Sequence, residues 1–255
     1  MRIFKTKALV IKRRNLGETS RVLTMISSDR GRLEVLVRGI RRPRHRYSGI
    51  LEPFSLVNVR LQSGRIFDTL QEADLDGVFI NLDDELKGLG VGSIVLEILD
   101  RISLADDIDH RVYNLVYDYL RCYRNFQVEM ADSTNALVFL SSFLLSVLAV
   151  TGRLPLMDLC VVCGQERKGE VVLTVYGACH KNCLARDGVY RVLTLEQLML
   201  MRRIVAESVD SLISSPVSNQ DMKKIFGLVL FLYYSFFERD IRSLKFFEGV
   251  YRKFE

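Results

Sequence analysis

The first eighty residues alternate apolar and polar positions with a period of two, which is the pattern of half-buried β-strands. The stretch 33-LEVLV-37, for example, places its odd-numbered residues on one face and its even-numbered residues on the other. Comparable stretches cover residues 4–13, 20–28, 56–62 and 65–74. The N-terminal third of the chain is therefore predicted to contain five short strands.

Short turn sequences separate these strands. Asp29, Arg30 and Gly31 stand between the second and third strands, and Ser63 and Gly64 stand between the fourth and fifth. Glycine is favoured in such turns because it adopts positive φ without steric cost, so each pair is expected to form an antiparallel hairpin. Five short strands with these connections predict a small closed or half-closed β-barrel of the OB type.

After residue 80 the apolar positions take up helical spacing instead. Helices are expected over residues 81–99, 107–125, 136–150, 194–206 and 218–237. The third of these, 136-ALVFLSSFLLSVLAV-150, contains three serines and is shorter than the roughly 18–20 residues that span a bilayer. It is expected to be a buried helix, and no membrane partner is expected.

Positive charge is concentrated at the N-terminal end. Residues 1–48 contain 14 lysines and arginines but three acids, a net charge of +11, which leaves −6 for the rest of a chain whose total is +5. A basic face that is merely solvated usually has acids interleaved with the cations, and here they are nearly missing. An anionic partner is therefore expected for the N-terminal part.

The densest charge falls in 37-VRGIRRPRHRYSGILEPF-54, between the third and fourth predicted strands. Guanidinium groups form bidentate hydrogen bonds with phosphate, and each neutralised phosphate releases condensed counterions. We expect this loop and the cations near the first two strands to form one nucleic-acid-binding groove. The candidate residues are Lys12, Arg13, Arg14, Arg21, Arg38, Arg41, Arg42, Arg44, Arg46 and Tyr47.

Two aromatic residues, Tyr47 and Phe67, lie near these cations in the predicted barrel. Nucleic-acid-binding OB domains stack successive bases on such rings, and this is the role expected of Tyr47. The alternative is that each ring belongs to the hydrophobic core, which is commoner for an aromatic residue beside a strand.

Four of the five cysteines form two close pairs, Cys160-x2-Cys163 and Cys179-x3-Cys183, separated by fifteen residues. Thiolates spaced in this way on tight turns supply the four ligands of a closed structural zinc site. The expected cofactor is one zinc ion with a role in folding. His180 could replace one of the cysteines as a ligand. Four free thiols and a labile redox pair are the alternatives.

The N-terminal residues 1–12 lack the layout of a signal peptide, so a cytoplasmic location without disulfides is expected. The patterns together predict an α+β multidomain chain. Its parts are an OB-fold nucleic-acid-binding domain over residues 1–80, an α-helical domain over 81–155 and 192–255, and a zinc-binding insert over 156–191.

No catalytic constellation stands out. The segment 88-GLGVGS-93 resembles a phosphate-binding loop, but it lies within a helical pattern and lacks the lysine that follows the last glycine of such loops. It is expected to mark a place where helices approach closely. The three histidines, at positions 45, 110 and 180, are scattered, so the chain is predicted not to be an enzyme.

Several short motifs resemble the bacterial RecO family of recombination mediators. The motifs are Gly17-Glu18 with Arg21-Val22-Leu23, Asp29-Arg30-Gly31, Arg38-Gly39 with Arg41-Arg42-Pro43, Leu51-Glu52-Pro53-Phe54, Gly152-Arg153-Leu154-Pro155 and Leu159–Gly164. The resemblance implies an OB-fold domain, a helical domain and a zinc-binding insert that some members lack. The x3 spacing of the second cysteine pair departs from the commoner x2 form.

The resemblance also implies function. Such proteins bind single-stranded and double-stranded DNA, anneal complementary strands, and contact the acidic C-terminal tail of the single-stranded DNA-binding protein, SSB. With RecR they help to load the recombinase RecA onto SSB-coated DNA, so RecA is an indirect partner. The expected location is then the cytoplasm, in association with the nucleoid.

The protein-docking surface is expected on the helical part. Arg202 and Arg203, which follow 198-LMLM-201, are candidates for contact with an acidic, apolar tail. The alternative is a helix whose Leu/Met face lies in the core. Two other functions stay open. Phosphate contacts do not distinguish RNA from DNA, so an RNA-binding OB protein is one rival, and a metal-dependent nuclease or hydrolase is the other.

Overall fold

The computed structural model describes residues 2–80, 86–103, 110–126, 129–166, 170–184, 188–215, 217–237 and 240–252. Its packing divides the chain into two compact units. Unit 1 comprises Met1–Gln127 and Ile241–Glu255, and unit 2 comprises Val128–Asp240. Unit 2 is thus inserted into unit 1 along the chain, and the C-terminal segment completes the first unit.

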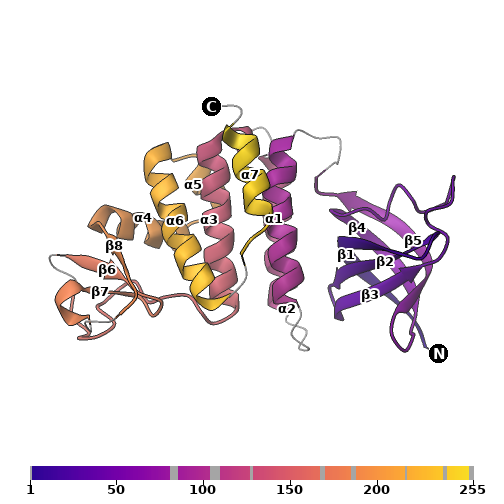
Figure 1. Cartoon of the computed structure of the whole chain (residues 1–255), viewed down its shortest axis with the longest axis horizontal. Coiled ribbons are helices and arrows are strands. Elements are labelled where there is room, and N and C mark those ends of the chain that lie inside the picture. Colours follow the sequence, from indigo (N-terminus) through magenta and orange to yellow (C-terminus); the bar gives the residue numbers. More distant parts are fainter. Residues whose placement is uncertain are drawn as a thin grey trace. The chain divides into compact units, whose positions relative to one another are not determined.

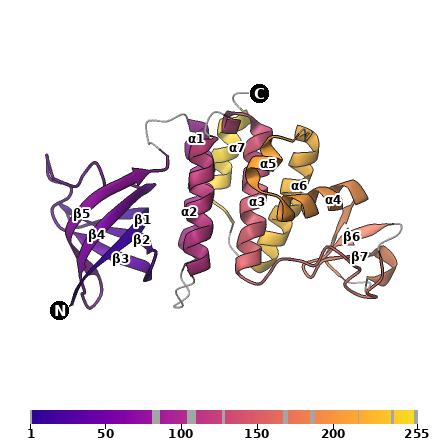
Figure 2. The same cartoon turned by 180° about the vertical axis from the view of Figure 1, so that it is seen from behind.

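Unit 1 starts with a closed barrel of five strands, visible from two sides in Figure 1 and Figure 2. The strands are β1 (Ile3–Leu16), β2 (Ser20–Ser27), β3 (Gly31–Val37), β4 (Ser55–Gln62) and β5 (Asp68–Val78). Their order is β1-β2-β3-β5-β4, and β4 pairs with β1 to close the barrel. The barrel confirms the predicted OB-type fold.

Both predicted hairpins are present. β2 and β3 pair antiparallel around the Asp29–Gly31 turn, where Gly31 has a φ of 64°. β4 and β5 also pair antiparallel, although β5 begins at Asp68 and not at residue 65. Closure depends on a short parallel contact between β3 and β5, at Val35 with Asp68 and Leu36 with Thr69.

Three helices belong to unit 1: α1 (Leu86–Ile102), α2 (His110–Asn125) and α7 (Ser243–Arg252). The expected beginnings of the first two helices, residues 81–85 and 107–109, lie outside the described residues. Glu97 of α1 accepts hydrogen bonds from the backbone N–H groups of Arg242 and Ser243 at 3.0 and 2.8 Å. The C-terminal helix is thereby fastened to α1 at its first turn.

The glycines of 88-GLGVGS-93 form a stripe of close packing along α1. Gly88 faces Tyr123 of α2, Gly90 faces Phe247 of α7, and Gly92 faces the barrel side chains Phe54 and Ile80. All three glycines are buried. The segment is helical, so the prediction of a helix contact is confirmed and a phosphate-binding loop is excluded at these positions.

Replacing Gly92 with alanine is expected to destabilise unit 1 by about 1–3 kcal/mol, because the added Cβ would lie 2.7 Å from the Phe54 ring in a packed core. Gly249 in α7 is the matched control, since no atom of the described residues outside its own helix backbone lies within 4 Å of a Cβ there. Gly249→Ala should stabilise the helix by about 0.5–1 kcal/mol. Urea unfolding measures both, and equal stability of the two variants would contradict the packing assigned to α1.

Unit 2 combines helices with a small sheet. Its helices are η1 (Glu129–Ala131), α3 (Ser133–Val150), η2 (Lys181–Cys183), α4 (Leu195–Ala206), α5 (Val209–Ile213) and α6 (Asn219–Phe236). The sheet has the order β7-β6-β8, with β6 (Val171–Leu173), β7 (Ala178–His180) and β8 (Arg191–Leu193). The predicted capping box of Thr194 and Gln197 opens α4.

Helix α3 is the core of unit 2. By length and composition alone it could cross a membrane, with a mean hydropathy of 1.9, but 67% of it is buried against neighbouring helices. It packs on α4, α5 and α6, and Asp132 caps its first turn by accepting from the backbone of Thr134 at 2.8 Å. The predicted buried helix is therefore confirmed.

Candidate nucleic-acid interface and metal site

The basic loop, residues 38–54, joins β3 to β4 as a chain of turns. Backbone hydrogen bonds link Arg42 to Gly39 at 2.9 Å and Ser48 to His45 at 3.1 Å. Three apolar side chains of the loop, Ile40, Tyr47 and Leu51, are 2%, 8% and 0% exposed and belong to the barrel core. The loop is thus anchored from within, which leaves its charged side chains on the surface.

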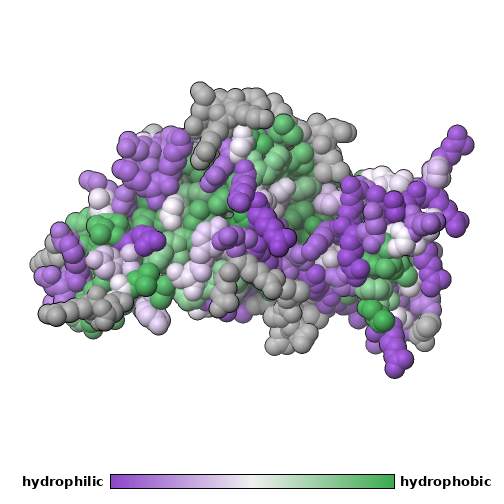
Figure 3. Space-filling model, in the orientation of Figure 1, coloured by the Kyte–Doolittle hydropathy of each residue, from purple (hydrophilic) through white to green (hydrophobic). Residues whose placement is uncertain are grey.

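Six exposed arginines gather on this part of the barrel, and we call them the arginine surface. They are Arg14, Arg38, Arg41, Arg42, Arg44 and Arg46. Within the described ranges none of them forms an ion pair with a carboxylate. Hydrophilic side chains also cover most of the barrel face seen in Figure 3. Unpaired guanidinium groups at this density are suited to a polyanion.

The other three predicted cations are bound to carboxylates of the chain itself. Lys12 donates to Asp100 of α1 at 2.7 Å, and Arg13 and Arg21 both bind Glu52 of the basic loop. Glu52 thereby ties the loop to β1 and β2. These partners lie far away in sequence, so the charge count could not separate these cations from the arginine surface. Their contact with DNA stays a prediction.

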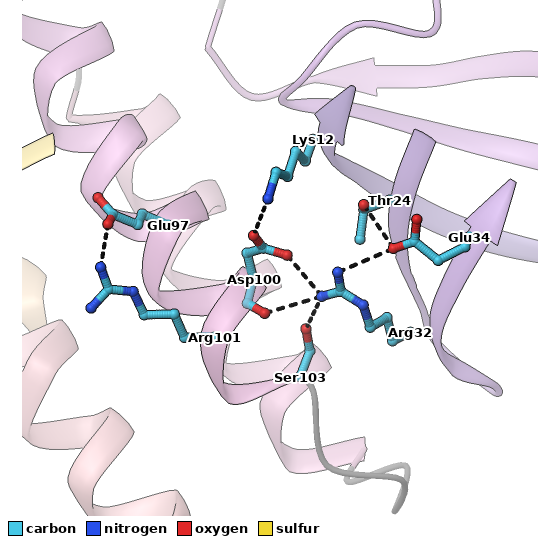
Figure 4. A network of polar contacts seen from close by, with 8 residues as sticks. All are labelled: Lys12, Thr24, Arg32, Glu34, Glu97, Asp100, Arg101 and Ser103. Atoms are coloured by element: carbon cyan, nitrogen blue, oxygen red, sulfur yellow. Dashed lines mark hydrogen bonds and ion pairs between the residues drawn. The ribbon is translucent and has the colours of Figure 1, made fainter. Parts of the chain in front are cut away.

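Asp100 connects α1 to the barrel through a network drawn in Figure 4. Besides Lys12, it faces Arg32, whose guanidinium lies 2.8 Å from the carboxylate and also donates to the Asp100 carbonyl at 3.0 Å. Burial raises the pKa of Asp100, but the hydrogen bonds from Lys12 and Arg32 outweigh it, and the net pKa is lowered. Asp100 therefore remains ionised and holds Lys12 in place.

Tyr47 lies in the barrel core, which speaks against its expected role in stacking on bases. The residue is 8% exposed, its body fills the barrel core, and the guanidinium of Arg46 lies 5.0 Å from its ring centroid. A ring in that position has no free face for a base. Phe67 likewise has a cation over it, Arg14 at 5.2 Å. The core alternative therefore applies to Tyr47.

An open groove of about 410 Å³ lies beside the arginine surface. It is lined by Leu16, Thr19, Ser20, Leu36, Arg38, Gly39 and Arg42. Sequence reasoning assigned no role to Leu16 or Leu36. A signal was nevertheless present, because the alternation of 33-LEVLV-37 places Leu36 on the polar face of its strand, where an apolar residue is unexpected.

The second candidate site is a cluster of three cysteines and a histidine in unit 2. The ligand atoms of Cys160, Cys163, His180 and Cys183 all lie within 4.8 Å of one another. The Nδ1 atom of His180 is 3.5 Å from the Cys163 sulfur, while its Nε2 donates to the Glu166 carbonyl at 3.1 Å. That carbonyl orients the ring with Nδ1 toward the thiols, as in metal-ligating histidines. The donor set fits a tetrahedral metal ion.

The cluster contains His180 and not the predicted ligand Cys179, which favours His180 as the fourth ligand. Cys179 and His180 are neighbours on β7, where successive side chains point to opposite sides of the strand. Cys179 is 0% exposed and packs with Cys160 and Val172 in the small core of the insert. With His180 as ligand, the second pair becomes His180-x2-Cys183 and its spacing equals that of the first pair.

The thiols differ in acidity. Burial raises the pKa of Cys160, but backbone N–H groups of Cys163, His180 and Val162 outweigh it and lower the pKa to about 6. Burial and the neighbouring thiols raise the pKa of Cys183 to about 11. Cys160 is therefore the thiol that ionises most readily, and a cation would relieve the crowding of negative charge around Cys183.

Arg202 and Arg203 both lie in α4 and both are paired. Arg202 binds Asp158 at 2.7 Å, and Arg203 binds Glu207 at 2.9 Å. Of the preceding 198-LMLM-201, Leu198 and Met201 are buried, whereas Met199 is 56% exposed. Two of these four apolar residues therefore lie in the core, as the alternative to a docking surface requires. A role in partner binding stays a prediction.

Comparison with known proteins covers both units. The family model "Recombination protein O N terminal" matches residues 1–79, and "Recombination protein O C terminal" matches residues 84–245. A DNA repair protein RecO from Thermoanaerobacter sp. is 27% identical over 166 residues, which are 65% of this chain and 64% of that protein. Another from Nocardioides sp. is 30% identical over 169 residues, 64% of this chain and 65% of the relative.

The chain thus spans less than two thirds of the length of several relatives that it matches, at 64%, 65% and 60%. The match to DNA repair protein RecO of Desulforamulus reducens extends further, with 23% identity over 255 residues, 99% of this chain and 96% of the relative. The two family models together account for the barrel and for most of the helical part. This chain belongs to the Recombination protein O family.

Proposed function

We propose that this protein is a DNA-binding recombination mediator in DNA repair that performs no catalysis of its own. The observation that carries the proposal is the arginine surface, where six exposed guanidinium groups have no carboxylate partner among the described residues. Membership of the Recombination protein O family supports the assignment to repair and recombination. The barrel would hold the sugar–phosphate backbone and leave the bases accessible.

Both single-stranded and double-stranded DNA are proposed ligands, since both present phosphates at a spacing that clustered guanidinium groups can follow. Binding two strands on one positive surface screens their mutual repulsion, which lets complementary strands anneal without ATP. Three further cations are proposed to contact DNA, namely Lys12, Arg13 and Arg21. Each would release its carboxylate partner in the protein and bind a phosphate instead.

The backbone of the basic loop supports a functional role. Arg44 has a φ of 59°, a left-handed conformation that costs a residue with a Cβ about 1 kcal/mol or more. A glycine would adopt it freely, yet the position carries an exposed arginine. A side chain retained at a conformational cost is consistent with a function outside folding.

Replacing Arg44 with glycine is therefore expected to leave the free energy of unfolding unchanged or to raise it by up to about 1 kcal/mol, while DNA affinity falls. Arg42→Gly is the control, because its φ is not left-handed and glycine there should cost about 0.5–1 kcal/mol with a similar loss of affinity. Thermal unfolding and fluorescence anisotropy measure the two effects. A lower free energy of unfolding for Arg44→Gly would contradict the backbone strain assigned to this position.

The metal site is proposed to hold one zinc ion with a structural role. Three cysteines and one histidine saturate the tetrahedral preference of zinc and leave no position for a reactive water. The insert has a small core of Cys160, Val172 and Cys179 and strands of three residues, so a metal would supply much of its stability. The bound ion would organise the insert around Cys160, Cys163, His180 and Cys183.

Proposed protein partners are RecR and the acidic C-terminal tail of SSB, with RecA as an indirect partner. Arg202 and Arg203 remain the candidates for an acidic tail, which would compete with Asp158 and Glu207. We also propose that the chain has three domains. They are the barrel over residues 1–80, the helical domain over 81–155 and 192–255, and the zinc-binding insert over 156–191. A cytoplasmic location at the nucleoid follows from DNA as the ligand.

Binding assays with DNA and RNA of one sequence test the proposal against its rivals. We expect DNA binding without ATP and no strand cleavage when Mg²⁺ is added. RNA bound more tightly than DNA would favour an RNA-binding OB protein, and cleavage would favour a nuclease. Either outcome would overturn the proposed function.

A further inference from the structure

The groove beside the arginine surface is lined by two leucines as well as two arginines, a combination that phosphate binding alone does not require. Leu16 at the end of β1 is 38% exposed, and Leu36 on β3 is partly exposed. Arg38 and Arg42 line the same groove. Its volume of about 410 Å³ falls within the roughly 300–1,000 Å³ typical of ligand sites.

The strand register explains why these side chains meet. Leu16 pairs with Ser20 across β1 and β2, and Val22, two residues after Ser20, pairs with Leu36 on β3. Paired residues and residues two apart share one face of a sheet. Leu16, Ser20 and Leu36 therefore lie on the outer face of three adjacent strands, and Arg38 continues the row from β3.

Three hydrogen bonds hold the two walls of the groove together. Arg41 donates from its backbone to the Thr19 carbonyl at 2.9 Å and from its side chain to the Gly17 carbonyl at 3.2 Å. The backbone N–H of Gly39 donates to the Ser20 hydroxyl at 3.3 Å. The turn between β1 and β2 is thus fixed to the basic loop, so the groove is formed before a ligand arrives.

We infer that this groove is a subsite for an unstacked nucleobase of single-stranded DNA, with the adjoining phosphates on Arg38 and Arg42. The inference rests on the proposed function. The two partly exposed leucine side chains can pack on the face of a base, which in a duplex is covered by its neighbours. A single strand can therefore use both the leucines and the cations, whereas a duplex can use the cations alone.

Charge selects a nucleic acid over an acidic peptide as the occupant. Besides Arg38 and Arg42, the arginine surface contains four further exposed arginines without carboxylate partners among the described residues, Arg14, Arg41, Arg44 and Arg46. A ligand that satisfies so many cations in series must carry a regularly repeated negative charge, which is the property of a phosphodiester chain.

The test compares three labelled ligands of equal length in the full-length protein: a thymine single strand, an abasic single strand and a duplex. The double variant Leu16→Ala/Leu36→Ala should bind the thymine strand roughly fivefold to tenfold more weakly, at the lower end of what one stacked base contributes. Its affinity for the abasic strand and the duplex should be unchanged. Leu75→Ala is the matched control, because Leu75 is 45% exposed on β5 and outside the groove.

The cations should behave differently from the leucines. The double variant Arg38→Gln/Arg42→Gln is expected to have a lower affinity for all three ligands, since each carries phosphates. An equal loss for all three ligands in the leucine variant, or no loss for the thymine strand, would overturn the base subsite. Displacement of the strand by an acidic, apolar peptide from the wild type, but not from the leucine variant, would overturn it in favour of a peptide. A wild type that binds none of the ligands would overturn the proposed function itself.

Discussion

Replacing His180 with alanine is expected to remove the metal from the insert, whereas replacing Cys179 with alanine should leave it bound. His180 contributes one of the four ligand atoms that lie within 4.8 Å of one another, while Cys179 is not among them and is fully buried in the small core of the insert. Elemental analysis of the purified variants should give about one zinc per chain for the wild type and Cys179→Ala. The Cys160→Ser and His180→Ala variants should contain no zinc.

The stability of the insert should follow the metal. Structural zinc contributes about 10–16 kcal/mol of binding free energy in small zinc domains, so His180→Ala and Cys160→Ser should unfold the insert. Cys179→Ala removes a small buried side chain and should cost about 1 kcal/mol. A metal-free wild type would contradict the site altogether. Loss of metal from Cys179→Ala, with retention in His180→Ala, would restore the four-cysteine set.

Replacing Arg41, Arg42, Arg44 and Arg46 together with alanine is expected to flatten the salt dependence of DNA binding. Each lost phosphate contact lowers the slope of log K against log salt by about 0.9 on duplex and about 0.7 on a single strand. Four contacts would therefore reduce it by up to about 3.6 on duplex and about 2.8 on a single strand. Titrations at several salt concentrations measure the slope for each ligand.

The control for this variant removes two cations elsewhere on the barrel. Lys5 and Arg60 are paired across β1 and β4, and Arg60 already binds Glu72. Lys5→Ala/Arg60→Ala should lower affinity slightly through net charge and leave the slope almost unchanged. If the loop variant kept the wild-type slope, the basic loop would have no place in the DNA interface.

The barrel could be predicted because its determinants are local. Period-two patterns and glycine turns are written within stretches of ten residues, and they specified all five strands and both hairpins. The closure of the barrel was harder to predict from the sequence. It depends on the contact of Val35 and Leu36 with Asp68 and Thr69, which lie more than thirty residues away. The glycine stripe of α1 was recognised as a contact, but its partners were not.

The sequence predicted which kinds of residue form the candidate sites, but it did not predict which individual residues take part. Spacing located the metal cluster, but the register of β7 decides between Cys179 and His180, and spacing does not encode that register. Tyr47 lies in the core because the basic loop packs its apolar side chains against those of the barrel strands. Lys12 is held by Asp100, 88 residues along the chain, and only the tertiary fold brings the two charges together.

If the arginine surface brings DNA strands together, the protein should accelerate the annealing of complementary strands. Two labelled complementary strands are mixed at physiological salt without ATP, with and without the protein, and duplex formation is followed by fluorescence transfer. We expect the wild type to accelerate annealing and the variant lacking the loop arginines at positions 41, 42, 44 and 46 not to do so. Equal annealing rates with and without the wild-type protein would contradict it.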